Sequence, residues 1–193
     1  MDRRVLIIIG GVIVVSAVAT GALLMQPREE RLVPEQQKIN RSNTMSTLQL
    51  SSSAFEQNAT IPKKYTCQGE GVNPPLSISG APEGTKTLAL IMDDPDAPMG
   101  VWDHWVMWNI LPDITSIAEN SVPGGAVLGS NSSGKNEYQG PCPPSGTHRY
   151  RFSVYAVFDI LSLKPGSTKA ELLNALTGGI LGQYTLVGLY QKS

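Results

Sequence analysis

Both histidines of this chain lie in two short polar segments that hold most of its potential chemistry. The first segment spans residues 93–105 and reads DDPDAPMGVWDHW; the second spans residues 140–150 and reads GPCPPSGTHRY. A carboxylate close to an imidazole favours the imidazolium form, which offers positive charge and N–H donors. If Asp94 lies near His104 or His148, the sequence therefore predicts a site for an anion such as a phosphate or a carboxylate.

Proline and glycine shape both segments. The two prolines of the DPDAP motif at 94–98 fix φ and remove backbone donors, so the loop can hold the carboxylate of Asp94 in one direction. Gly140 has no Cβ, so backbone N–H groups there can approach a bound anion closely. Aromatic side chains at Trp102, Trp105 and Tyr150 would supply a wall. These residues predict a rigid polar pocket on a β scaffold.

Other interpretations of the same residues stay open. His104 lies beside two tryptophans and suits a core histidine, and Asp96 suits a turn that bonds its own backbone. Two histidines and a carboxylate can hold a metal ion, but their spacing matches no metal motif such as HExxH. Ser145 lies three residues before His148, without the GxSxG elbow of a hydrolase. We therefore expect no catalytic residue, no metal and no cofactor.

The elements flanking these segments are expected to be strands. Residues 87–92 form a continuous apolar run that ends in acidic residues, which predicts a central strand buried on both faces. Alternation over 102–109 predicts a strand with one face made of Trp102, His104, Val106 and Trp108. Further strands are expected at 148–156 and 184–191 and around Leu48.

One helix is predicted after Thr168. Glu171 follows Thr168 by three residues, which is the spacing of a capping box. Leu172, Leu173 and Leu176 would form its apolar stripe, and the two glycines at 178–179 would end it.

Composition limits both the fold class and the function. With 193 residues, of which 41% are hydrophobic, the chain can bury one ordinary core. Its 19 glycines and 14 prolines disfavour a helical bundle and favour a mainly β fold. A net charge of −1 without a basic cluster argues against nucleic-acid binding.

The N-terminus differs from the rest of the chain. Arg3 and Arg4 precede an uncharged apolar run, Val5 to Met25, which is long enough for a membrane-spanning hydrophobic helix. We expect residues 1–25 to be a transmembrane anchor, with a signal peptide as the alternative because residues 17–19 read AVA. In both cases the domain lies outside the cytoplasm, on a single-pass membrane protein or in a secreted one. Residues 26–46 read as a polar linker and residues 47–193 as the folded domain.

The two segments closely resemble the signature regions of the phosphatidylethanolamine-binding protein family, in its bacterial and archaeal Raf-kinase-inhibitor-like branch. The resemblance rests on DPDAP at 94–98 with DHW at 103–105, on GPCPP at 140–144 with GTHRY at 146–150, and on YTC at 65–67 and NPPL at 73–76. It implies a β-sandwich-like core with a few peripheral helices and a small pocket at one end. Carried over by position, that pocket would be lined by Asp94, Pro98, Trp102, His104, Gly140, His148 and Tyr150.

The resemblance also implies a class of function. Family members act as modulators of kinase pathways or proteases, so we expect a non-catalytic module that binds phosphate or phosphorylated head groups and has a protease or kinase as a possible partner. An inhibitor that works through an exposed loop is one alternative, and a hydrolase of phosphorylated or lipid substrates is another. The interval from Pro98 to His104 is short, and the chain ends soon after Tyr190. We therefore expect a more open pocket than in animal members.

Cys67 and Cys142 are the only cysteines. In an exported domain a disulfide between them would persist and would tie the 65–67 region to the second segment. Two unpaired buried thiols are the alternative.

Overall fold

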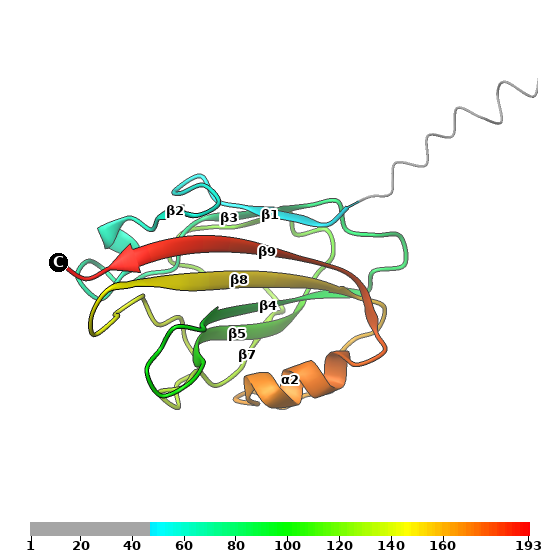
Figure 1. Cartoon of the computed structure of the whole chain (residues 1–193). Coiled ribbons are helices and arrows are strands. Elements are labelled where there is room, and N and C mark those ends of the chain that lie inside the picture. The colour runs from blue at the N-terminus through cyan, green and yellow to red at the C-terminus, as the bar shows by residue number, and fades with distance from the viewer. Residues whose placement is uncertain (1–46) are drawn as a thin grey trace, which may run out of the picture. The chain divides into compact units, whose positions relative to one another are not determined.

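The protein was analysed as a computed structural model that describes residues 47–193. The described residues form two β-sheets and one α-helix (Figure 1). The larger sheet has the order β2-β9-β8-β4-β5-β7, with β2 (Ala59–Thr60), β4 (Thr87–Asp94), β5 (Trp102–Ile110), β7 (Val127–Leu128), β8 (Thr147–Val157) and β9 (Ile180–Gln191). The smaller sheet has the order β1-β3-β6, with β1 (Gln49–Ser51), β3 (Leu76–Ser79) and β6 (Ser116–Ile117). A 3-10 turn, η1 (Lys63–Tyr65), and helix α2 (Lys169–Leu176) complete the fold, and the predicted mainly β class is confirmed.

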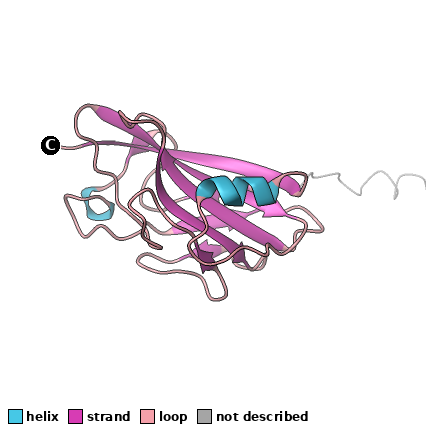
Figure 2. Ribbon diagram, turned by 90° about the horizontal axis from the view of Figure 1, so that it is seen from below, coloured by secondary structure: helices cyan, strands magenta, loops and turns pink. Residues whose placement is uncertain are grey.

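Strand β4 lies inside the larger sheet, between β8 and β5, and all of its residues are buried. Leu88, Leu90 and Met92 face the main core, which also contains residues of the smaller sheet. The alternate residues, Ala89 and Ile91, face a second core that is closed by α2. Figure 2 shows the helix lying across one face of the sheet. Both faces of β4 are covered, which explains why residues 87–92 form a continuous apolar run.

Antiparallel pairing brings four strand ends together at one edge of the fold. Asp93 in β4 pairs with Arg151 in β8, and Asp94 pairs with Trp102 in β5. At the same end of the long β8–β9 pair, Thr147 lies opposite Gln191. The two polar segments, far apart in sequence, thus end side by side.

A β-bulge in β5 makes the predicted alternation wrong at His104. Met92 pairs with Trp105 while Asp93 pairs with Asp103, so His104 is an extra residue on β5. His104 was expected on the face of Val106 and Trp108, which belong to the second core. Its ring instead contacts Tyr150, whose side chain belongs to the main core. Because a bulge inserts one residue, the side-chain parity shifts at this position, and His104 turns to the site.

Helix α2 begins at the predicted capping box. Thr168 N–H donates to the Glu171 carboxylate (2.7 Å), and Glu171 N–H donates to the Thr168 hydroxyl (3.3 Å). Leu172 and Leu176 are buried, but the Leu173 side chain, placed in the apolar stripe from the sequence, is exposed. Leu173 adjoins Leu172 in the helix, and a step of one residue turns its side chain away from the sheet.

The predictions for residues 1–25 and 26–46, including the N-terminal hydrophobic helix, fall outside the described residues. Within residues 47–193, no helix has the length and apolar character needed to cross a bilayer.

Candidate functional site

A cavity of about 380 Å³ opens where the ends of β4, β5 and β8 meet. Six of the seven residues predicted to line a pocket do line it: Asp94, Pro98, Trp102, His104, His148 and Tyr150. The other lining residues, which the sequence did not assign to the pocket, are Ala97, Met99, Gln139, Cys142, Pro143 and Pro144. Trp105, expected in the aromatic wall, is buried in the main core and packs against Tyr138 instead.

Gly140 is the predicted residue that does not line the cavity. A Cβ at this position would lie 2.8 Å from the carbonyl oxygen of Tyr65 and 2.9 Å from Cα of Thr66. Glycine is therefore needed here because two backbones pass in close contact. Gly140 thus lets the segment that carries Gln139 and Cys142 pass against residues 65–66.

His148 and Asp94 form a buried pair at the base of the cavity. The Nδ1–H group of His148 donates to Oδ2 of Asp94 at 2.7 Å, and both side chains are almost fully buried. The other carboxylate oxygen of Asp94 accepts the backbone N–H of Asp96 (2.8 Å). These bonds fix the imidazole so that only its Nε2 edge is left for a ligand.

His104 lies in an environment different from that of His148. Its Nδ1–H group donates to the carbonyl oxygen of Gln139 at 2.7 Å. Burial lowers the pKa of His104, and this outweighs the opposing effects of the Gln139 carbonyl and of Asp94. The sequence tied the imidazolium form to whichever histidine lies near Asp94; the structure pairs Asp94 with His148, and burial dominates the pKa of His104. In the neutral form Nδ1 carries the proton, so Nε2 is a hydrogen-bond acceptor.

Tyr150 supplies a hydroxyl group between the two histidines. Its ring packs edge-on against His104 at 5.2 Å and stacks with His148 at 6.5 Å between centroids. Among the described residues, no partner makes a hydrogen bond of ordinary geometry with this buried hydroxyl. Burial, then the nearby charge of Asp94, raises the pKa of Tyr150. The phenol therefore stays protonated and is available as a donor.

An ion pair holds the loop that carries Pro98 and Met99. The backbone N–H, Nε and Nη2 of Arg149 all donate to the carboxylate of Asp96, at 2.9, 2.9 and 2.6 Å. Hydrogen bonds from Arg149 lower the pKa of Asp96 to about 2. Asp96, for which a turn role was one alternative from the sequence, therefore joins one side of the cavity to β8.

Gln139 makes the hydrogen bonds that hold the opposite side of the cavity. Its side-chain oxygen accepts Nε1–H of Trp102 (3.3 Å) and the hydroxyl of Ser133 (2.8 Å), while its backbone oxygen accepts His104. Residues 131–139 read as an ordinary polar loop, and no motif marks Gln139. Sequence reasoning had no signal with which to find it.

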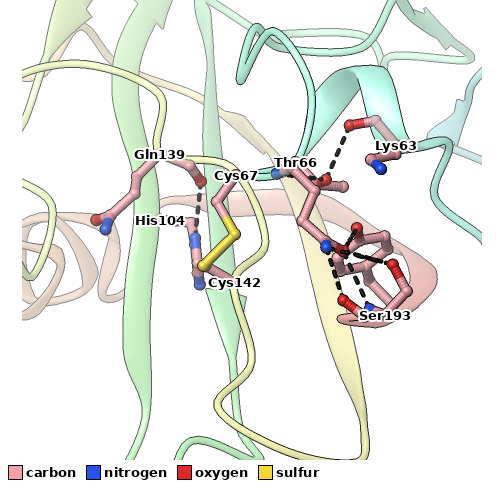
Figure 3. Close-up of a disulfide and its surroundings, with 9 residues drawn as sticks. Lys63, Thr66, Cys67, His104, Gln139, Cys142 and Ser193 are labelled. Atoms are coloured by element: carbon pink, nitrogen blue, oxygen red, sulfur yellow. Dashed lines mark hydrogen bonds between the residues drawn. A yellow bond between two sulfur atoms is a disulfide. The ribbon is translucent and has the colours of Figure 1, made fainter.

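The predicted disulfide between Cys67 and Cys142 is present in the structure (Figure 3). Beside it, the backbone N–H of Cys67 donates to the carbonyl oxygen of Pro141 at 3.1 Å. Since Cys142 lines the cavity, the bond joins the cavity wall to the segment that follows η1. Within residues 47–193, no three His, Cys, Asp or Glu side chains are grouped so as to hold a metal ion.

The profile of a family described as phosphatidylethanolamine-binding protein matches residues 51–191. The chain belongs to the phosphatidylethanolamine-binding protein family. Membership in this family supports a binding module as the coarse function, as the sequence resemblance implied.

Members of the phosphatidylethanolamine-binding protein family from archaea and bacteria are similar to this chain. A protein named UPF0098 from Methanothermobacter thermautotrophicus is 49% identical over 150 residues, which cover 75% of this chain and 99% of the relative. Its counterpart from Chlamydia trachomatis is 44% identical, with the same coverage of both chains. The match to each relative spans almost the whole relative and three quarters of this chain.

Two solved structures share the fold. A Chlamydia trachomatis homologue of phosphatidylethanolamine-binding protein aligns with a TM-score of 0.74 at 43% identity, covering 77% of this chain and 99% of its own. The E. coli protein YbcL, described as a member of the mammalian family, aligns with a TM-score of 0.71 at 28% identity, covering 76% and 99%.

Proposed function

We propose that the cavity binds a small phosphate-bearing anion, either free phosphate or a phosphorylated head group, and that the chain acts through binding without catalysis. The observation that carries the proposal is the Tyr150 hydroxyl, which is buried beside two imidazoles that also line the cavity and makes no hydrogen bond of ordinary geometry among the described residues, although Asp94 and the backbone of Cys142 lie close to it. A buried polar group without a well-formed hydrogen bond costs free energy, which a bound acceptor would recover.

The hydrogen-bonding groups around the cavity match a phosphate that keeps one proton. Tyr150 donates its hydroxyl proton to one phosphate oxygen. Neutral His104 offers Nε2 as an acceptor for a P–OH group. His148, fixed by Asp94, presents its own Nε2 edge to a third oxygen. A protonated phosphate also suits the buried carboxylate of Asp94, because it carries less negative charge than the fully ionised form and is repelled less.

Calorimetric titration of residues 47–193 with phosphate and with phosphoethanolamine tests the proposal. We expect saturable binding that weakens at least about tenfold in Tyr150→Phe, the loss of one buried hydrogen bond. Tyr155→Phe is the matched control, because Tyr155 lies on the same strand and packs against the second core. Equal affinity in all three proteins would overturn the pocket assignment. Release of phosphate from phosphoethanolamine by the wild-type protein would overturn the non-catalytic assignment.

A further inference from the structure

A network of ion pairs joins helix α2 to the strands that carry the cavity residues. Nζ of Lys169, the first residue of α2, donates to Oδ2 of Asp93 in β4 at 2.5 Å and to Oδ1 of Asp103 in β5 at 2.9 Å. Nε and Nη2 of Arg151 in β8 donate to the same carboxylate of Asp93 at 2.7 and 2.9 Å. We call these four residues the charge cluster. Its two cations balance its two carboxylates.

The two carboxylates of the charge cluster lie beside the bulge that positions His104. Asp93 and Asp103 are cross-strand partners in the pairing of β4 with β5, next to the register shift that leaves His104 as the extra residue. They bond to α2, which crosses one face of the larger sheet (Figure 2). Asp94 and His104, the residues that follow them in sequence, line the cavity. Each carboxylate of the cluster is thus one residue away from a cavity side chain.

Lys169 occupies a position that helix rules alone disfavour. The N-terminus of a helix is the positive end of its dipole, so a cation in the first turn is unfavourable there. Burial also opposes the charged form of Lys169, but hydrogen bonds to Asp93 and Asp103 outweigh burial and raise the pKa of Lys169. The two carboxylates lie opposite each other and would repel each other without a cation. Contacts with the strands therefore explain the lysine at this position.

A second set of contacts holds the backbone of the bulge. Asp103 N–H donates to the hydroxyl of Ser132 at 2.8 Å, and Gln139 N–H donates to the carbonyl oxygen of His104 at 2.9 Å. These bonds come from the loop that contains residues 132–139. The charge cluster adds a contact through the side chain of Asp103, so a substitution of Lys169 removes this contact and leaves the loop residues unchanged.

We propose that Lys169 is a positioning residue for the cavity: it joins the two strands at the bulge from the side of α2 and so holds His104 towards the ligand. Its cation also balances carboxylates next to a site for an anion. Three carboxylates act electrostatically on His104, and a phenol packs against its ring: Asp94, Asp93, Asp103 and Tyr150. The effect of Lys169 on His104 is a property of the domain, whereas its effect on a ligand rests on the proposed function.

NMR titration of the His104 imidazole and calorimetry with phosphate test this proposal on residues 47–193. This part of the chain contains the whole match to the family profile, and 150 matched residues make up 99% of a natural relative. In Lys169→Met we expect the pKa of His104 to rise by about one pH unit, because Asp93 and Asp103 then act on it without the cation. Phosphate affinity at neutral pH should fall at least about tenfold, a typical effect of losing one charged contact. Lys169→Arg, which keeps a cation, should retain both wild-type values.

Two control variants separate positioning from stability and from net charge. Leu172→Ala removes a buried side chain of α2 outside the charge cluster, so it should lower Tm and leave the pKa of His104 and the phosphate affinity unchanged. Lys164→Met removes an exposed cation that precedes α2, and it should change none of these values. Thermal unfolding verifies that each variant is folded.

The double variant Asp103→Asn/Lys169→Met keeps the charge balance of the cluster and loses the contact between α2 and β5. Phosphate affinity should fall in it as well, and a wild-type affinity would show that Lys169 acts through charge alone and overturn its positioning role. This variant also serves if Lys169→Met does not fold.

An unchanged pKa of His104 in folded Lys169→Met would overturn the proposal and assign the position of the bulge to the loop of residues 132–139. Equal changes in Leu172→Ala would overturn it too, because any weakening of α2 would then have the same effect. A wild-type domain that binds no phosphate would overturn the proposed function, while the pKa of His104 in Lys169→Met would still decide the role of Lys169.

Discussion

The imidazole of His104 and the phenol of Tyr150 pack edge to face, with 5.2 Å between their centroids, because β5 carries one extra residue. Without the bulge, His104 would follow the alternation of β5 and face the second core with Val106 and Trp108. The bulge places it beside Tyr150 and next to the carbonyl oxygen of Gln139. A local irregularity of the sheet thus determines which groups the cavity offers to a ligand.

The lowered pKa of His104 predicts how anion affinity depends on pH. Sulfate is a suitable probe because its charge stays constant throughout the ordinary titration range of histidine, about pH 8 to pH 5, and well below it. Burial keeps His104 neutral down to a pH below its ordinary range, so the affinity for sulfate should rise as the pH falls and imidazolium forms. Calorimetry on the wild type and on His104→Gln measures this. The part of the rise that belongs to His104 should disappear in the variant, and identical pH profiles would contradict the assignment.

The close contact of Gly140 with residues 65–66 predicts that Gly140→Ala destabilises the domain. The added Cβ would meet backbone atoms of Tyr65 and Thr66 at 2.8 and 2.9 Å, and neither can move without displacing η1 or its neighbours. We expect the free energy of unfolding to fall by about 1–3 kcal/mol, the usual cost of overpacking. Gly124→Ala is the control, since nothing lies within 4 Å of its Cβ position. Urea unfolding of both variants measures the difference; similar values would show that the contact relaxes easily.

The sequence predicted β1, β4, β5, β8 and β9 and most of the cavity lining because their signals are local, whereas it gave no signal for the short strands β2, β3, β6 and β7. The apolar run before Asp94, the alternation around Tyr150 and the capping box at Thr168 each follow from neighbouring residues, and the structure contains all three elements. The residues of the two polar segments came together because antiparallel pairing of β4 with β5 and β8 aligns their ends.

The features that the sequence did not predict depend on contacts between distant segments. The lowered pKa of His104 follows from its burial, and its tautomer follows from the carbonyl group of Gln139; neither has a sequence pattern. The bulge at His104 adds a residue without changing the apolar alternation on either side of it. Gly140 was assigned to the ligand because glycine suits both an anion site and a backbone crossing, and only the path of residues 65–66 distinguishes the two.

The disulfide predicts a loss of stability on reduction. It joins residues separated by 75 positions, so its removal frees a long loop in the unfolded chain. The chain-entropy description gives about 4 kcal/mol for a loop of this length. We expect the free energy of unfolding of Cys67→Ser/Cys142→Ser, measured in urea, to be lower by a comparable amount. The variant should also bind phosphate more weakly, because Cys142 lines the cavity.

Reductant should lower the free energy of unfolding of the wild type to the same extent and leave that of the double variant unchanged. A wild type that is insensitive to reductant, with both thiols freely alkylated, would contradict the bond.

The ion pair between Asp96 and Arg149 predicts how the domain responds to acid. Arg149 lowers the pKa of Asp96 to about 2 in the folded chain, below the value of about 3.9 that an aspartate has when unfolded. The pair therefore stabilises the fold above about pH 4, and this contribution is lost as the pH falls towards 2. Asp96→Asn should lower Tm by about 2–4 °C at neutral pH, a modest effect because Arg149 is largely exposed. The difference in Tm from the wild type should then shrink towards pH 2.

Asp113→Asn is the control for this prediction, since Asp113 is exposed and lies outside the cavity. A difference in Tm between Asp96→Asn and the wild type that stays constant from neutral pH to pH 2 would show that Asp96 acts through packing and not through its charge.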